Sequence, residues 1–176
     1  STSMGIDVIA RRHKAIVHRS RVGEAHVAEE LGKKGGVIGG EGNGGVIYPA
    51  LHSTRDALLA AAIALDWLAA DQRPLSRRVA EEMPPLVMVK RKLDLRIQDA
   101  ASLEVSLRDA FPDGERNTLD GEKYLWEDGW VQVRASGTEP IVRILAEART
   151  QERADALAAR AAEAAAKSQP AAATVR

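Results

Sequence analysis

The chain has 176 residues, of which 45% are hydrophobic and 28% charged, a composition typical of a globular protein with one large or two small domains. Its 25 basic and 25 acidic residues give a formal net charge of zero, which argues against a nucleic-acid-binding protein, and the lack of cysteine excludes disulfides and cysteine metal sites. No apolar run is long enough to cross a membrane and no signal peptide is recognisable, so we expect a cytoplasmic protein.

Helix and strand signals alternate through the first half of the sequence. Its predicted helices begin after residues 1–3 and span residues 25–34 and 56–70. Its predicted strands span residues 15–18 and 36–39. Apolar residues recur at helical spacing in the third helix, and Ser53 or Thr54 is expected to cap it. Because alternating strands and helices are typical of parallel sheets, the first half is predicted to be an α/β domain with a parallel sheet layer.

A break in this pattern separates the two halves. Residues 70–74 and the run Met83-Pro84-Pro85 interrupt it on either side of a short predicted helix. The predicted organisation is a first domain over residues 1–72, a linker over 73–85, a second domain over 86–167 and a disordered tail over 168–176.

The second domain carries signals for one sheet and two helices. Its predicted strands span residues 86–93, 123–127, 130–134 and 141–147, and its predicted helices span 100–110 and 151–167. The Asp128-Gly129 pair is typical of a hairpin turn. This pattern predicts an α+β domain with a mainly antiparallel sheet and helices on one face.

An arginine, two hydroxyls and a glycine lie between the last two predicted strands, in the run Arg134-Ala135-Ser136-Gly137-Thr138-Glu139-Pro140, and Arg143 follows. Arginine offers a planar fork of donors that fits phosphate, and Ser136 and Thr138 add hydroxyl donors. Gly137 lets backbone N–H groups turn toward an anion. These residues predict an oxyanion site, although an ordinary hairpin turn beside an arginine contains the same residue types.

A second cluster places five glycines around one carboxylate and one amide, in the run Gly39-Gly40-Glu41-Gly42-Asn43-Gly44-Gly45. The small neighbours let a sugar approach the backbone, while Glu41 can accept from two adjacent hydroxyls and Asn43 can donate or accept. A flexible glycine turn at the end of a strand is the alternative. So many glycines in a plain turn would cost conformational entropy without a compensating gain.

Three segments resemble signatures of the α-D-phosphohexomutase superfamily, which comprises phosphomannomutases, phosphoglucomutases and phosphoglucosamine mutases. Residues 134–143, Arg-Ala-Ser-Gly-Thr-Glu-Pro-Ile-Val-Arg, are similar to its C-terminal phosphate-binding signature. The Gly39–Ile47 run resembles its sugar-binding loop, and Ser20–Glu24 resembles a turn upstream of that loop. All three segments occur in the family's order, so the resemblance extends over most of the chain.

The resemblance implies roles for both halves and for individual residues. Residues 1–72 would be part of the third, sugar-binding α/β/α domain, and residues 86–167 would be the fourth, phosphate-binding domain. The implied phosphate ligands are Arg134, Ser136, Gly137, Thr138 and Arg143. The implied sugar ligands are Gly23, Glu24, Glu41, Asn43 and Gly44. Many members end the sugar loop with Gly-His where this chain has Gly44-Gly45, so an imidazole contact is absent and the preferred hexose stays open.

The resemblance also implies a parent enzyme, an intramolecular phosphotransferase (isomerase). Such enzymes move a phosphoryl group between C1 and C6 of a hexose through a phosphoserine, Mg²⁺ and a bisphosphorylated intermediate. Neither the serine loop nor the aspartate-rich metal loop of the family occurs here, and the four histidines lack ligand spacing, so we assign no catalytic or metal-binding residue.

We therefore expect a C-terminal fragment that is inactive by itself. Its expected partners are a phosphohexose and the N-terminal domains of the same protein, together with further copies of itself bound through the truncated domain, but neither nucleic acid nor membrane. A stand-alone, non-catalytic sugar-phosphate-binding module is the alternative.

Overall fold

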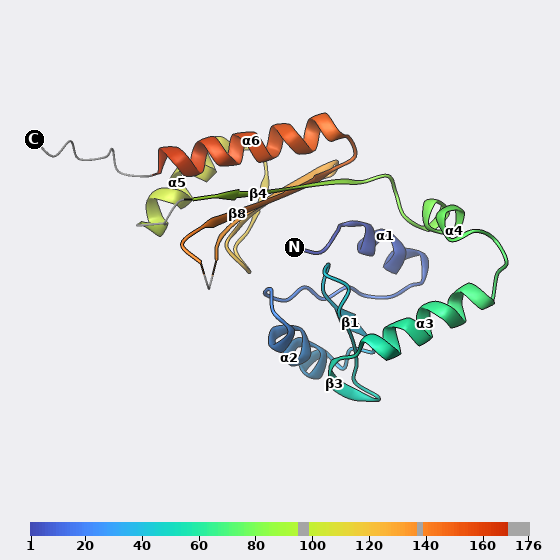
Figure 1. The fold of residues 1–176 in the computed structure, drawn as a ribbon. Coiled ribbons are helices and arrows are strands. Elements are labelled where there is room, and N and C mark those ends of the chain that lie inside the picture. Colours follow the sequence, from blue (N-terminus) through green and yellow to red (C-terminus); the bar gives the residue numbers. More distant parts are fainter. Residues whose placement is uncertain (95–98, 137–138, 169–176) are drawn as a thin grey trace, which may run out of the picture. The chain divides into compact units, whose positions relative to one another are not determined.

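The computed structural model describes residues 1–94, 99–136 and 139–168, and the chain divides into two compact units, Ser1–Pro85 and Leu86–Arg176 (Figure 1). The expected linker over 73–85 falls inside the first unit. Of the expected tail, Ser168 is buried at the end of a helix, where its hydroxyl donates to the Ala165 carbonyl at 2.8 Å, and the rest lies outside the described residues.

The first unit contains four helices and one small sheet among its described residues. The helices are α1 (Gly5–Arg12), α2 (Glu24–Lys34), α3 (Ala57–Ala69) and α4 (Leu75–Glu82). The strands are β1 (Gly39–Gly40), β2 (Val46–Tyr48) and β3 (His52–Arg55). They pair antiparallel in the order β1-β2-β3.

The α/β class of this unit is confirmed, but the predicted parallel layer is wrong. Only residues 41–45 connect β1 to β2, and only residues 49–51 connect β2 to β3. Such connections fit antiparallel neighbours, since a parallel crossover needs about a dozen residues or more. The predicted strand over 15–18 is also wrong, because these residues pair with no strand of the described chain and Ile16 is 82% exposed.

Local sequence explains several of the helix boundaries. Gly35 ends α2 in the left-handed conformation, with φ of 62°, and its N–H donates to the Leu31 carbonyl. The cap of α3 is Asp56, whose carboxylate accepts from the Leu59 N–H at 2.9 Å. The prediction of Ser53 or Thr54 as the cap is wrong because both residues belong to β3.

Helix α3 is apolar nearly all round, yet none of its residues is buried by the described part of the chain. Leu58 is 84% exposed, Leu65 65% and Trp67 39%. A helix of this composition is typically a core element. Val37 and Ile38, near β1, are likewise exposed.

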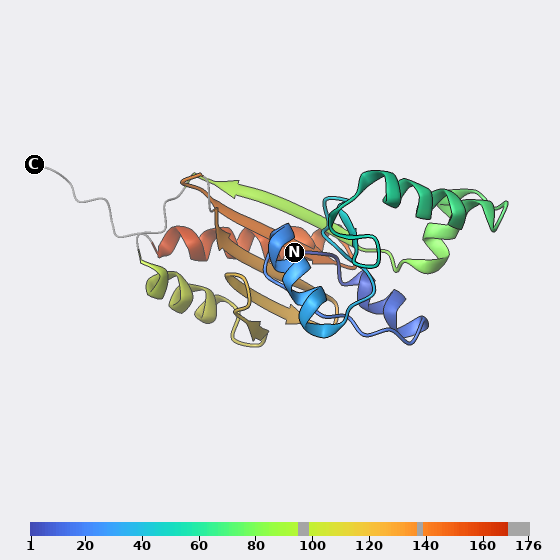
Figure 2. The ribbon, with the colours of Figure 1, turned by 90° about the horizontal axis from the view of Figure 1, so that it is seen from below.

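The second unit is a five-stranded antiparallel sheet with two helices on one face (Figures 1 and 2), as predicted. The strands are β4 (Val87–Leu93), β5 (Glu115–Asn117), β6 (Glu122–Trp126), β7 (Gly129–Ala135) and β8 (Val142–Ala148). The helices are α5 (Ala100–Ala110) and α6 (Gln151–Lys167). The spatial order of the strands is β4-β8-β7-β6-β5. The sequence analysis did not predict β5.

The core of this unit lies between the sheet and its helices. Val131, Val133 and Ile144 of the central strands pack against Leu107 and Leu157 of the helices, and all five are buried. Alternate residues of β7 and β8 therefore face away from the helices. This alternation decides where the basic residues near the ends of both strands lie.

Candidate functional site

The predicted phosphate loop closes the hairpin between β7 and β8. The Ser136 N–H donates to the Ile141 carbonyl at 2.9 Å, and the Ile141 N–H donates to the Glu139 carbonyl at 2.8 Å. Ser136 thus stands at the base of the loop, directly after β7. Gly137 and Thr138, which were predicted to complete the phosphate cradle, lie outside the described residues.

Arg134 and Arg143 are partners in the antiparallel register of β7 and β8. Their strand neighbours Val133 and Ile144 point into the core, so both arginines lie on the sheet face opposite the helices. Lys92 of β4 is the register partner of Arg143 on its other side. Three basic residues thus stand in one row across β4, β8 and β7, an arrangement that is repulsive unless anions compensate it.

Nearby acidic residues satisfy these arginines only in part. Arg143 donates through Nη2 to Glu139 at 3.0 Å, and Arg134 Nε lies 3.9 Å from Asp120 Oδ2. The Nε atoms of both arginines and Oδ2 of Asp120 are buried, and none has a hydrogen-bond partner in the described chain. Because a buried charged donor without a partner is costly, the pair favours an anionic ligand.

Gly121 lets the turn before β6, which contains Asp120, lie close to Arg134. Gly121 has φ of 72°, and a Cβ there would lie 2.5 Å from the Val133 carbonyl oxygen and 2.7 Å from Cβ of Arg134. Any larger residue would push the turn that contains Asp120 away from β7. Gln132 also fixes this turn by donating to the Asp120 carbonyl at 2.7 Å.

The predicted sugar loop is a tight turn between β1 and β2. The Glu41 N–H donates to the Gly45 carbonyl at 3.1 Å, and the Gly44 N–H donates to the Glu41 carbonyl at 3.0 Å. The Asn43 side chain accepts from the Gly45 N–H at 3.1 Å. Gly44 has φ of 92°, which a residue with a side chain rarely adopts. Gly44 is therefore required by the turn itself.

Glu41 connects the loop to the turn that precedes α2. Its Oε1 atom accepts from the Gly23 N–H at 2.9 Å, and Gly23 has φ of 125°. The structure thus brings together two of the predicted sugar ligands. This contact gives Glu41 a structural role in holding the two segments together.

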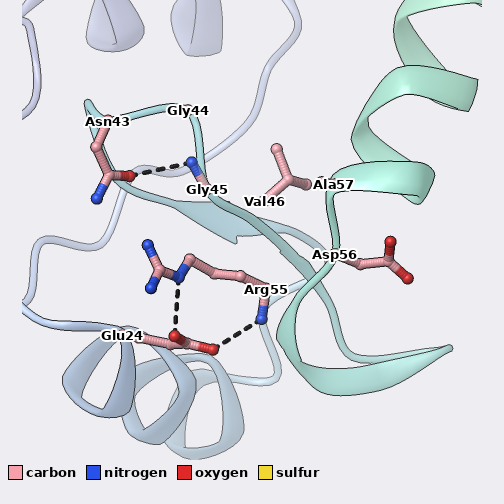
Figure 3. A pocket seen from close by; sticks show the side chains of 8 residues that line it. All are labelled: Glu24, Asn43, Gly44, Gly45, Val46, Arg55, Asp56 and Ala57. Atoms are coloured by element: carbon pink, nitrogen blue, oxygen red, sulfur yellow. Dashed lines mark hydrogen bonds and ion pairs between the residues drawn. The ribbon is translucent and has the colours of Figure 1, made fainter.

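An open pocket of about 410 Å³ lies beside this loop. Its lining residues are Glu24, Asn43, Gly44, Gly45, Val46, Arg55, Asp56 and Ala57 (Figure 3). Three of them, Glu24, Asn43 and Gly44, are predicted sugar ligands, whereas Gly23 and Glu41 are not part of the lining. Arg55 is the pocket residue of most chemical interest that sequence reasoning missed.

Glu24 and Arg55 form a two-point contact across the pocket (Figure 3). Oε1 of Glu24 accepts from the Arg55 backbone N–H, and Oε2 accepts from Arg55 Nε, both at 2.8 Å. The backbone hydrogen bond, followed by the guanidinium hydrogen bond, lowers the pKa of Glu24 below its ordinary value. Glu24 is therefore ionised at neutral pH and orients the arginine.

Neither a cluster of metal-ligating side chains nor a membrane-spanning helix is found among the described residues. No group of three or more His, Asp or Glu side chains among them is placed to hold a metal ion. The described residues of this chain therefore supply no such site for the Mg²⁺ that the family resemblance implies for the parent enzyme. In the described part of the chain, no helix is long and apolar enough to cross a membrane.

Comparisons with known proteins match both halves of the chain. Residues 1–86 match the family described as phosphoglucomutase/phosphomannomutase, alpha/beta/alpha domain III. Residues 78–164 match the phosphoglucomutase/phosphomannomutase C-terminal domain.

Individual relatives belong to the same group. A "Probable phosphoglucosamine mutase" of Methanopyrus kandleri is 40% identical over 156 residues, covering 86% of this chain and 34% of the relative. A phosphoglucomutase/phosphomannomutase of Thermococcus kodakarensis is 39% identical over 155 residues, covering 88% of this chain and 34% of the relative. The chain thus spans about a third of the length of the curated relatives it matches.

A solved structure supports the fold. The crystal structure of a phosphoglucomutase/phosphomannomutase family protein from Burkholderia thailandensis matches with a TM-score of 0.75 at 24% identity, covering 91% of this chain and 34% of that one. The sequence matches to both domains and this structural likeness agree on the family and on the fold. The chain therefore belongs to the phosphoglucomutase/phosphomannomutase family of α-D-phosphohexomutases and corresponds to its domain III and C-terminal domain.

Proposed function

We propose that this chain is the substrate-recognition part of an enzyme that interconverts hexose 1-phosphate and hexose 6-phosphate. In this proposal the 134–143 segment binds the phosphate that is not being transferred, and the 39–45 loop with Gly23 and Glu24 binds sugar hydroxyls. The observation that carries it is the facing pair Arg134 and Arg143, whose Nε atoms are buried without a hydrogen-bond partner in the described chain.

An anchor of this kind suits the chemistry of a mutase. The reaction needs one fixed site for the non-reacting phosphate, and the site must accept the sugar in either orientation. Two arginines and the Ser136–Thr138 loop offer several charge-assisted donors to one dianion. Fixing the distal phosphate positions the other end of the sugar for phosphoryl transfer.

The transfer itself is assigned to the rest of the parent protein. A phosphoserine would donate the phosphoryl group, and Mg²⁺ would neutralise charge as it moves. The residues of this chain would bind and orient the substrate.

A stand-alone sugar-phosphate-binding module would show the same binding. The upstream coding sequence separates the two, because only the mutase parent encodes a serine loop and an aspartate-rich loop in the same frame.

Titration of the isolated chain with inorganic phosphate tests the anchor. We expect millimolar binding, because most of the gross hydrogen-bond energy is offset by desolvation and by the entropy of association. NMR shifts should appear around Arg134, Ser136 and Arg143, and Arg134→Ala should abolish them. Arg108→Ala on the exposed surface of α5 is the matched control and should leave them unchanged. Equal phosphate binding in Arg134→Ala and wild type would place the anchor elsewhere.

A further inference from the structure

Arg55 occupies the space beside the sugar loop that a side chain at position 45 would need. A Cβ built on Gly45 would lie 2.2 Å from Cδ and 3.1 Å from Cγ of Arg55. These atoms belong to the middle of the arginine stem and not to its free end. Since Nε of this arginine donates to Oε2 of Glu24 at 2.8 Å, the stem cannot move aside without breaking that hydrogen bond.

The orientation of Arg55 is fixed at both ends. Its backbone N–H, at the end of β3, donates to Glu24, and its Nε donates to the other oxygen of the same carboxylate. Glu24 itself stands in the first turn of α2. An arginine held in this way has already lost much of the rotamer freedom that binding a ligand would otherwise remove.

The remaining donors of Arg55 face the pocket together with those of Asn43 (Figure 3). Arg55 Nη1 and Nη2 make no hydrogen bond within the described chain. Asn43 uses its oxygen to accept from Gly45, which leaves its amide N–H groups available. Asp56 also lines the pocket, but its carboxylate caps α3 and contacts His52 at 3.0 Å. The free groups of the pocket are therefore mainly hydrogen-bond donors.

We propose that Arg55 is a substrate-positioning residue that donates hydrogen bonds from its terminal nitrogens to hydroxyl oxygens of the bound hexose. Glu24 compensates the charge of Arg55, so the guanidinium acts as an oriented pair of donors and not as an uncompensated cation. This inference rests on the proposed function, because it takes the ligand of the pocket to be a hexose phosphate.

NMR titrations of the isolated chain with α-D-glucose 1-phosphate and with inorganic phosphate test the role of Arg55. In wild type, the sugar phosphate should shift the amides of residues 43–46 as well as those around Arg134. Arg55→Ala should weaken sugar phosphate binding roughly three- to tenfold, the loss of one or two hydrogen bonds. The affinity for inorganic phosphate should not change. Arg55→Lys should recover only part of the loss, since an ammonium lacks the planar fork.

Two matched pairs separate positioning from a general effect on folding. Arg77→Ala removes an exposed arginine of α4 and should leave the sugar titration unchanged. Gly45→Ala should weaken sugar binding by displacing Arg55, whereas Gly32→Ala, which meets no atom within 4 Å, should not. If Arg55→Ala does not fold, Arg55→Met, which keeps most of the stem but removes the terminal nitrogens, should still weaken sugar binding.

The outcomes distinguish this inference from the proposed function. Wild-type shifts at residues 43–46 that persist with equal affinity in Arg55→Ala would overturn the role of Arg55 alone. No shift in either loop of the wild-type chain would overturn the proposed function and this inference with it. A selective loss of the sugar-dependent shifts in Arg55→Ala and Gly45→Ala, with phosphate binding intact, would support both.

Discussion

Arg134 and Arg143 face each other across β7 and β8, and Nε of each is buried without a hydrogen-bond partner in the described chain. Like charges placed directly opposite each other in a sheet are destabilising. Glu139 and Asp120 relieve this repulsion only in part, one by an exposed ion pair and the other at 3.9 Å. The sheet therefore carries a local cost that an anion bound between the arginines would reduce.

Phosphate should stabilise the folded chain through this pair. A ligand that binds only the native state adds about 2.7 kcal/mol when its concentration reaches 100 times Kd, and less at lower concentrations. Thermal unfolding should therefore shift upward by a few degrees as phosphate is added. We expect Arg134→Ala to remove the shift and Arg134→Lys to restore part of it. A phosphate-dependent shift that survives in Arg134→Ala would contradict the assignment.

Glu139 should compete with phosphate for Arg143. Its carboxylate accepts from Arg143 Nη2 at 3.0 Å, and its charge would repel a phosphate dianion at the same place. Glu139→Gln should tighten phosphate binding about two- to fivefold at low ionic strength, and added salt should reduce the gain. The control is Glu127→Gln. Glu127 is an exposed acid that precedes the first residue of β7, at the end of the strand away from Arg134. Calorimetry measures both, and equal tightening by the two variants would indicate a non-specific charge effect.

The isolated chain should show no mutase turnover. It contains neither the serine loop nor the aspartate-rich loop of the family, and its described residues offer no cluster that could hold a metal ion. The assay supplies hexose 1-phosphate, Mg²⁺ and a hexose bisphosphate primer. Formation of hexose 6-phosphate is followed by its oxidation in a coupled enzyme reaction. Turnover on the enzymatic scale of about 1–10³ per second would refute the assignment of transfer to the rest of the parent.

The sequence predicted well where the evidence is local. The predicted strands over 86–93, 123–127, 130–134 and 141–147 each agree within one residue at either end with β4, β6, β7 and β8. The register that places Arg143 opposite Arg134 was not predicted, because it depends on how the loop between the two strands closes. The predicted cap of α3, Ser53 or Thr54, lies too close to the N-terminus. Because β3 extends to Arg55, Asp56 is the first residue that is free to cap the helix.

Contacts between distant segments could not be predicted in the same way. Glu24 and Arg55 are 31 positions apart, and neither belongs to a motif that would indicate their pairing. The strand predicted over 15–18 has the right composition but pairs with no strand in the described chain. One sequence signal did point to Arg55. Many family members have Gly-His where this chain has Gly44-Gly45, and the missing side chain at position 45 leaves space that another residue can fill.

Self-association should follow from the exposed apolar surface of α3. Leu58 and Leu65 are 84% and 65% exposed, and the helix has almost no polar residues to make contact with water favourable. We expect the isolated chain to form dimers or larger species whose proportion rises with concentration. The double variant Leu58→Ser, Leu65→Ser should shift this equilibrium toward monomer, as measured by sedimentation velocity over a wide concentration range.

The matched control for α3 is Val105→Ser, since Val105 is 47% exposed on α5 of the second unit. That change removes exposed apolar surface from a helix whose exposed residues include Arg108 and Asp109, so the sedimentation profile should stay that of wild type. If the α3 variant and wild type associate equally, α3 is not the contact surface. A wild-type chain that remains monomeric at every concentration would show instead that an exposed apolar helix of this length does not suffice for association, and the expectation of self-association would fail.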